Sequence, residues 1–233
     1  MTSGAAVVIG ATGGIGGALA DALEEEGAHD CVWRFGRSLT RAAHLDLTDE
    51  ASIEAAAANV AAGPPPSLIL VATGLLAQGE HGPEKALRDL DPDWLARIFE
   101  VNTIGPALVA KHFLPLLPRA STPVFAALSA RVGSISDNRL GGWHGYRASK
   151  AALNMLIRNF AIDARRRYDR SIVIGLHPGT VDTPLSAPFQ GNVAPGKLFA
   201  PDRAALQLLD VIEALKPVDS GKVFAWDGAE IPA

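Results

Sequence analysis

The stretch that decides the fold reads Val7-Val8-Ile9-Gly10-Ala11-Thr12-Gly13-Gly14-Ile15-Gly16. An apolar run typical of a buried strand ends at Ile9, and a helical pattern begins at Gly14. Glycines at such a junction permit a tight turn, let the backbone approach a pyrophosphate and allow helix and strand to pack closely. Gly10, Gly14 and Gly16 therefore predict a phosphate-binding turn at the positive end of a helix dipole. The competing interpretation is a tight turn without a ligand.

Short apolar runs alternate with longer helical patterns along the rest of the chain. Strands are predicted at Ala5–Ile9, Cys31–Phe35, 68–71, Val124–Leu128, 172–176 and 223–226. Helices are predicted at Gly14–Glu26, Glu50–Ala61, 92–117, 146–168 and 202–215. We expect a single α/β domain over residues 1–233, a doubly wound parallel sheet of the Rossmann type with helices on both faces. Segments 79–83 and 186–196, interrupted by Gly and Pro, are predicted to be loops, and the second is either a lid or a plain connector.

Composition excludes several classes of protein. Apolar residues make up 48% of the chain and charged residues 20%, which is an ordinary globular balance. The net charge of -4 and the lack of a long basic run argue against nucleic-acid binding. Cys31 is the single cysteine, so there is no intrachain disulfide, and we expect it to be a small buried apolar residue. With no apolar run of membrane-spanning length and no metal-ligand spacing, the sequence predicts a cytoplasmic protein without a membrane segment or bound metal.

The second predicted strand indicates which nucleotide would bind. Folds that prefer NAD place an acidic residue about 20 residues after the glycine turn, where it holds the ribose 2′-hydroxyl. This region reads Arg34-Phe35-Gly36-Arg37-Ser38 and contains no acid. Arg37 offers a guanidinium fork suited to a 2′-phosphate, so NADP(H) is predicted in preference to NAD(H). The alternative is that Arg37 is a solvated loop residue.

A second signal lies in the helix predicted at 146–168. Tyr146 and Lys150 are four residues apart, which places a phenol and an ammonium on one helical face. That spacing alone is common on amphipathic helices. In combination with the glycine turn, it indicates a nicotinamide-dependent oxidoreductase.

Further motifs in the expected order give the chain a resemblance to the short-chain dehydrogenase/reductase superfamily, and within it to the carbonyl-reductase-like and C-factor-like branch. They are Leu45-Asp46-Leu47, Val101-Asn102-Thr103-Ile104-Gly105, the Tyr146 and Lys150 pair, and His177-Pro178-Gly179-Thr180-Val181-Asp182-Thr183. The resemblance implies the catalytic residues Tyr146, Lys150, Asn102 and Ser129. It implies cofactor contacts from Gly10, Thr12, Gly14, Ile15, Gly16, Arg37, Asp46, Leu47, Gly74, Tyr146, Lys150, Pro178, Gly179, Val181 and Thr183.

Hydride transfer between the cofactor and a small carbonyl or alcohol is the chemistry that the resemblance implies. Tyr146 would act as acid and base, Lys150 would also bind the nicotinamide ribose, and Asn102 would hold a water that relays protons. A free phenol has a pKa of about 10, too high for efficient proton exchange at neutral pH. An ammonium about 4 Å away would stabilise the phenolate by about 4 kcal/mol, or about three pKa units. We therefore expect Lys150 to bring the pKa of Tyr146 near neutrality.

Two departures from the family pattern stand out. Residues 71–74 read Val-Ala-Thr-Gly where the family often has Asn-Asn-Ala-Gly, so only Gly74 is shared. The position of the family's catalytic serine falls on Ala130, which has no hydroxyl. Ser129 and Ser134 are the candidate replacements; Ser129 is slightly preferred because it ends a strand, and the choice stays open.

The resemblance also bears on partners. It implies a homodimer or homotetramer that pairs the helix after Tyr146 and the helix bearing Asn102, whereas packing within a monomer is the alternative. Because Ser is displaced from position 130, a second hypothesis is a C-factor-like signalling or regulatory protein that binds the cofactor with little turnover. The identity of the substrate is not encoded in any motif.

Overall fold

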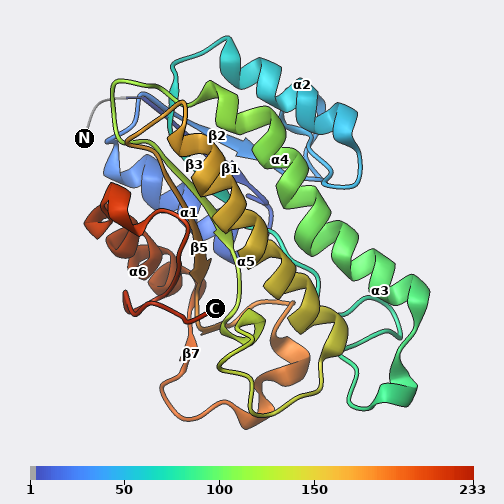
Figure 1. Cartoon of the computed structure of the whole chain (residues 1–233). Coiled ribbons are helices and arrows are strands. Elements are labelled where there is room, and N and C mark those ends of the chain that lie inside the picture. The colour runs from blue at the N-terminus through green and yellow to red at the C-terminus, as the bar shows by residue number, and fades with distance from the viewer. Residues whose placement is uncertain (1–3) are drawn as a thin grey trace.

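A parallel sheet between two layers of helices forms the body of the protein (Figure 1). The computed structural model describes residues 4–233. Its main strands are β1 (Ala5–Ile9), β2 (Cys31–Phe35), β3 (Pro66–Val71), β4 (Val124–Leu128), β5 (Ile172–His177) and β8 (Val223–Ala225). They pair in parallel in the order β2-β1-β3-β4-β5-β8. This order confirms the predicted doubly wound fold.

Helices cover both faces of the sheet. They are α1 (Gly14–Glu26), α2 (Glu50–Ala61), α3 (Pro92–Phe99), α4 (Gly105–Phe113), α5 (His144–Arg165) and α6 (Pro201–Ala214). Short 3-10 turns occur at Arg41–Ala43, Leu87–Asp89, Leu114–Leu116, Arg131–Gly133, Ala187–Asn192 and Pro217–Asp219. The core on one face joins α2, α4 and α5 to the sheet, and the core on the other joins α1 and α6. Within the described residues, no helix is both long and apolar enough to cross a membrane.

The strands read as continuous apolar runs because both of their faces are buried. Val7 and Ile9 of β1 belong to the core under α2, α4 and α5, while Ala6 and Val8 belong to the core under α1 and α6. Cys31 differs from its prediction: it is half-buried, because β2 forms an edge of the sheet and is covered less completely.

The helix predicted at 92–117 is interrupted. Asp91 caps its start, since its side chain accepts a hydrogen bond of 2.7 Å from the backbone N–H of Trp94. A π-helical turn at Glu100–Ile104 then separates α3 from α4. Such turns often occur at functional sites. Here the turn contains Asn102, whose side chain is completely buried.

The segment after β5 contains structure that the sequence did not predict. A small parallel pair joins β6 (Thr180–Val181) to β7 (Leu198–Phe199). Between these strands the predicted loop at 186–196 includes the 3-10 turn Ala187–Asn192. Figure 1 shows this segment and the connection from β4 to α5 beyond the same edge of the sheet. Ligands of open parallel sheets bind at this edge, where the strand order reverses.

Candidate active site

Two adjoining cavities occupy the carboxyl edge of the sheet, with volumes of about 720 Å³ and about 470 Å³. They share the lining residues Thr12, Gly13, Arg37, Ala72, Thr73 and Gly74. The larger cavity, here the catalytic cavity, contains Tyr146 and Lys150. The smaller one, here the nucleotide cavity, contains Asp46 and Leu47. The predicted cofactor and catalytic residues therefore converge on one crevice.

The glycine turn between β1 and α1 is shaped by contacts that leave no space for side chains. Gly10 has φ +90°, and a Cβ atom there would lie 2.6 Å from the carbonyl oxygen of Ala72. At Gly16 a Cβ would lie 2.2 Å from the carbonyl oxygen of Gly10, so this glycine serves packing and does not line a cavity. At Gly14 it would lie 2.7 Å from the Thr183 methyl group, inside the catalytic cavity.

The start of α1 forms a cradle for an anion. Gly17 donates the first amide hydrogen bond of the helix, to the carbonyl of Gly13. The preceding helical amides, at Gly14, Ile15 and Gly16, have no earlier helical carbonyl to pair with. Gly14 and Ile15 line the catalytic cavity, and Thr12 lines both cavities. Free amides and a helix dipole directed at a crevice fit the pyrophosphate of a dinucleotide.

At the nucleotide cavity, Asp46 is held by its neighbour. Its carboxylate accepts hydrogen bonds of 2.9 Å from the backbone N–H and the hydroxyl of Thr48. Burial alone would raise the pKa of Asp46, but these hydrogen bonds, with the charges of Arg37 and Arg97, lower it below its ordinary value. Leu47 and Gly10 line the same cavity. Asp46 is thus a fixed anionic acceptor beside the nucleotide site.

Arg37 is exposed and lines both cavities. Gly36, the residue before Arg37, lies against Thr12. A Cβ atom at Gly36 would meet the side chain of Thr12 at 3.0 Å, so Thr12 already fills the space beside it. Arg37 lies two residues after the end of β2 and lines the nucleotide cavity together with Asp46 and Arg97.

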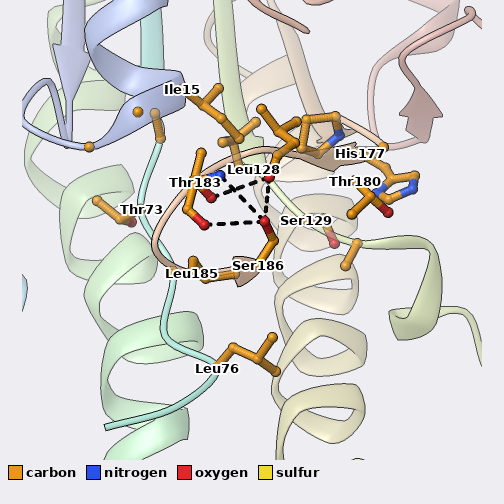
Figure 2. Close-up of a pocket in the computed structure, with 18 of the residues that line it drawn as sticks. Ile15, Thr73, Leu76, Leu128, Ser129, His177, Thr180, Thr183, Leu185 and Ser186 are labelled. Carbon is orange, nitrogen blue, oxygen red and sulfur yellow. Dashed lines mark hydrogen bonds between the residues drawn. The ribbon is translucent and has the colours of Figure 1, made fainter. Parts of the chain in front are cut away.

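Residues 178–183 form the wall opposite the sheet. Pro178, Gly179, Val181 and Thr183, which are predicted to contact the cofactor, all line the catalytic cavity. Gly179 has φ +77°, and a Cβ there would lie 2.8 Å from the ring of Phe199, so only glycine fits. Figure 2 shows Thr183 and Ser186 joined by hydrogen bonds in the connection after β6.

Gly74 and Thr73 stand where the two cavities meet. The Thr73 hydroxyl is buried and has no hydrogen-bond partner among residues 4–233. Buried polar atoms are rarely left unpaired, so an unpaired hydroxyl here suits a polar ligand. Together with the amides at the start of α1, it makes the crevice fit a dinucleotide.

Tyr146 and Lys150 lie one turn apart near the start of α5, and both are buried. The Lys150 ammonium donates a hydrogen bond of 2.8 Å to the carbonyl of Leu128 and lies 5.9 Å from the Tyr146 ring centroid. Burial raises the pKa of Tyr146 to about 12 and lowers the pKa of Lys150 to about 8. The expected lowering of the Tyr146 pKa is not produced by this geometry, because desolvation of the phenol dominates.

Asn102 holds the loop that follows β3. Its amide donates to the carbonyl of Leu75 at 2.8 Å and to the hydroxyl of Ser149 at 3.1 Å, and its carbonyl accepts from Leu75 N–H at 2.7 Å. These bonds join the π turn to α5 and to the residue after Gly74. Asn102 lies behind the wall of the crevice rather than among its lining residues. Its observed contacts therefore position the loop.

The three candidate positions for the missing hydroxyl differ in surroundings. Ala130 lines the catalytic cavity and packs in the same apolar cluster as Tyr146. Ser129 also lines the cavity, but its hydroxyl donates to the Asn154 side chain at 2.5 Å. Ser134 lies outside both cavities, and its hydroxyl accepts from the N–H of Asp137. Ala130, which shares the apolar cluster with Tyr146, has no hydroxyl, and of the two serines only Ser129 reaches the cavity.

Most of the remaining lining residues of the catalytic cavity come from segments in which the sequence shows no motif. They include Leu76, Ala130, Arg131, Val132, Trp143, Leu185, Phe189 and Val193. Figure 2 shows Thr73 and Leu76 on one side of the cavity and Ser129, His177 and Thr180 on the other. Burial lowers the pKa of His177 to about 4, and the charge of Arg131 acts in the same direction, so its imidazole is neutral at pH 7. Within residues 4–233, no three His, Cys, Asp or Glu side chains gather as metal ligands would.

Comparison with known proteins agrees with this geometry. A family model described as short chain dehydrogenase matches residues 4–193. The C-signal protein of Myxococcus xanthus is 37% identical over 180 residues, covering 77% of this chain and 99% of that protein. The 1-hydroxy-2-glutathionyl-2-methyl-3-butene dehydrogenase of Rhodococcus sp. (strain AD45) is 32% identical over 230 residues, covering 95% of this chain and 96% of the relative. Among solved structures, the NADPH-bound carbonyl reductase from chicken fatty liver has a TM-score of 0.81 at 26% identity and covers all of both chains.

Proposed function

This chain belongs to the short-chain dehydrogenase family, and we propose that it is an NADP(H)-dependent reductase of small carbonyl compounds. One observation carries the proposal. Tyr146 and Lys150 lie in the same crevice as the glycine cradle between β1 and α1. A proton donor and a dinucleotide site in one crevice suit the reduction of a carbonyl group to an alcohol.

Tyr146 is the proton donor in this proposal. A bound nicotinamide would supply the hydride. Because the pKa of Tyr146 is about 12, its phenol stays protonated at neutral pH. The alkoxide that forms during reduction is a stronger base than a phenolate, so the phenol can donate its proton to the substrate oxygen.

Lys150 and Asn102 support that step. The pKa of about 8 lets Lys150 exchange a proton near neutral pH, so it can restore the proton of Tyr146 through water. Lys150 would also hold the nicotinamide ribose. Asn102 fixes the backbone of Leu75 beside the crevice and would support a water in the proton path.

The cofactor preference rests on Arg37, an exposed guanidinium beside the nucleotide cavity, at the end of a strand that carries no acid. A 2′-phosphate would form charge-assisted bonds with it, and a free 2′-hydroxyl would not. We therefore propose NADP(H) as the preferred cofactor.

We further propose that two copies pair through α5, α4 and the π turn before α4, where Ile104 of the π turn and Met155 and Ile162 of α5 expose 51%, 62% and 49% of their surface. Sedimentation of the protein and of Met155→Asp would test this pairing. A dimer that dissociates in the variant supports it, and a monomeric parent contradicts it.

A screen of NADPH oxidation against ketones, aldehydes and quinones tests the proposed activity. Turnover with at least one carbonyl, faster with NADPH than with NADH, is the expected result. Tyr146→Phe serves as the matched control, since it removes one oxygen atom and keeps the ring. Tight NADPH binding without turnover on any member of the panel would instead indicate a cofactor-binding regulator.

A further inference from the structure

Trp143, at the entrance to α5, has an unusual backbone conformation. Its φ of 53° and ψ of 42° place it in the left-handed region, which large side chains rarely adopt. Gly141 and Gly142, just before it, both have φ 63°. A strained residue persists only where its surroundings fix it, and such residues concentrate at functional sites. The contacts of Trp143 show which residue holds this conformation and where the conformation directs the indole.

Glu84, in the connection between β3 and α3, holds Trp143 in this conformation. Its backbone carbonyl accepts a hydrogen bond of 2.6 Å from the N–H of Trp143, and its carboxylate accepts one of 3.0 Å from the N–H of Gly145. Glu84 is only 3% exposed. A carboxylate at the start of α5 also interacts favourably with the helix dipole and takes the place of a side-chain cap.

The fit around this carboxylate is close. A Cβ atom at position 145 would lie 2.7 Å from the second carboxylate oxygen of Glu84, so Gly145 is needed for the approach. That second oxygen is buried and has no partner among residues 4–233. Burying a carboxylate is costly, so its presence requires a compensating role. Holding the Trp143–Gly145 turn is the role that the contacts show.

The turn places the Trp143 indole in the catalytic cavity. Its ring lies edge-on to Tyr146, with centroids 6.3 Å apart and an interplanar angle of 74°. It also contacts Phe189, with centroids 5.3 Å apart. Phe189 comes from the segment between β6 and β7, so the two aromatic residues join both connections that enclose the cavity.

Most of the residues around this aromatic pair are apolar. Leu76, Ala130 and Val132 belong to the same apolar cluster, Leu185 and Val193 line the same cavity, and Arg131 is the charged residue among them. Aromatic rings bind flat rings by offset stacking and by edge-to-face contact, and Trp143 and Phe189 both line the cavity. A small or heavily hydroxylated substrate would gain little binding free energy from such a mostly apolar wall.

We propose that Trp143 is the specificity-determining residue of the catalytic cavity, that Glu84 is its positioning residue, and that the substrate carries its carbonyl on a flat apolar ring. This inference rests on the proposed carbonyl reduction and adds its substrate class. Trp143 contacts the ring of the substrate, and Glu84 acts only through Trp143 and the start of α5.

Binding without turnover tests this directly. Naphthyl methyl ketone is titrated by equilibrium dialysis into the Tyr146→Phe protein loaded with NADP⁺, which carries no hydride to reduce the ketone. Adding Trp143→Ala should weaken ketone affinity at least about tenfold, whereas Trp143→Phe should keep it within about threefold. NADPH affinity should stay within about twofold in every variant, because the indole lies at the substrate end.

Glu84 is tested in the same background. Glu84→Gln keeps an oxygen that can accept from Gly145 and should retain ketone affinity within about threefold, while Glu84→Ala should weaken it at least about fivefold. Glu80→Ala, an exposed carboxylate of the same loop, is the matched control and should change nothing. Unchanged ketone affinity in Trp143→Ala would overturn the proposal. Equal losses of ketone and NADPH affinity in Glu84→Ala would reduce Glu84 to a purely structural residue and overturn its assigned role.

The two proposals fail in different ways. If the ketone binds with the expected dependence on Trp143 but the parent reduces no carbonyl, the proposed activity is wrong and the binding site stands. If the parent reduces small aliphatic carbonyls but does not bind naphthyl methyl ketone, the activity stands and the substrate class is wrong.

Discussion

The two halves of the crevice are built in different ways. The nucleotide half comprises the nucleotide cavity and the residues that directly follow β1, β2 and β3, where Gly10 and Gly16 make contacts that exclude any side chain. The catalytic half is enclosed by the connection from β4 to α5, which contributes Trp143, and the connection from β6 to β7, which contributes Phe189. The nucleotide half depends on backbone conformations and close backbone contacts. The catalytic half depends on contacts between side chains from distant segments. We therefore expect cofactor binding to depend on backbone geometry, and the choice of substrate to depend on Trp143 and its neighbours.

Removing the proton donor should have the largest effect. Tyr146→Phe should lower turnover about 10²–10⁴-fold, because only the phenol oxygen is lost. NADPH affinity should be nearly unchanged, which separates the catalytic half from the nucleotide half. Steady-state kinetics and titration calorimetry on the same preparations provide both values. Substantial residual activity on a verified substrate would show that another group donates the proton.

The nucleotide half is tested by Arg37→Asp. Loss of the guanidinium and repulsion of the 2′-phosphate should weaken NADP(H) binding by about 1.5–3 kcal/mol, while NAD(H) binding changes less. Calorimetric titration of both cofactors into parent and variant measures the preference. Equal affinities of the parent for NADPH and NADH would contradict the assignment of Arg37.

The buried ammonium of Lys150 should lower the free energy of unfolding of the cofactor-free protein. Burial lowers the pKa of Lys150 to about 8, so from about pH 8 to 10.5 the unfolded chain binds more protons than the folded one. The stability of the parent should therefore rise through this range. Lys150→Met removes a buried charge but leaves the Leu128 carbonyl unpaired. We expect this variant to be inactive. Its free energy of unfolding near pH 7 should exceed that of the parent by about 1–3 kcal/mol.

Urea unfolding at several pH values measures this difference, with Lys85→Met as a control at an exposed position. The advantage of Lys150→Met should shrink as the pH rises above about 8. Above about pH 10 the raised pKa of Tyr146 acts in the opposite direction, so the stability of the parent should fall again. A difference between Lys150→Met and its parent that does not vary with pH would contradict the burial of a charged Lys150.

Replacing the two serines should have the smallest effects. Ser129→Ala should lower turnover about tenfold, or about 1.4 kcal/mol, because a half-turn of the Asn154 amide would free this hydroxyl for the substrate oxygen. Ser134→Ala should lower turnover less than about twofold, because it lies outside the cavity. Kinetics with one carbonyl substrate decides between them. If neither variant loses activity, Tyr146 acts without a serine.

The backbone requirements at several glycines explain why much of the crevice could be predicted from the sequence. A left-handed φ or a close approach of neighbouring atoms demands glycine, so the roles of Gly10, Gly14 and Gly179 could be recognised from the sequence. The spacing of Tyr146 and Lys150 is equally visible, because one helix sets it. Where the Lys150 ammonium binds was not predictable, since the Leu128 carbonyl comes from β4.

The catalytic half depends on contacts between distant segments. Glu84 stands in a stretch that reads as an exposed loop, yet it is buried against the start of α5. Gly141 and Gly142 signal an unusual turn, but they do not indicate where the next side chain points. The π turn around Asn102 was missed for the same reason, because the bonds to Leu75 and Ser149 that accompany it are not local. Contacts between side chains of distant segments leave no periodic pattern in the sequence.

Transfer of deuterium from C4-deuterated NADPH to the carbonyl carbon of a substrate tests the central claim most directly. The parent should yield an alcohol that carries deuterium on that carbon, detected by mass spectrometry, and Tyr146→Phe should yield almost none. NADPH that binds tightly while no deuterium reaches any carbonyl in the panel would contradict the assignment of this crevice to carbonyl reduction.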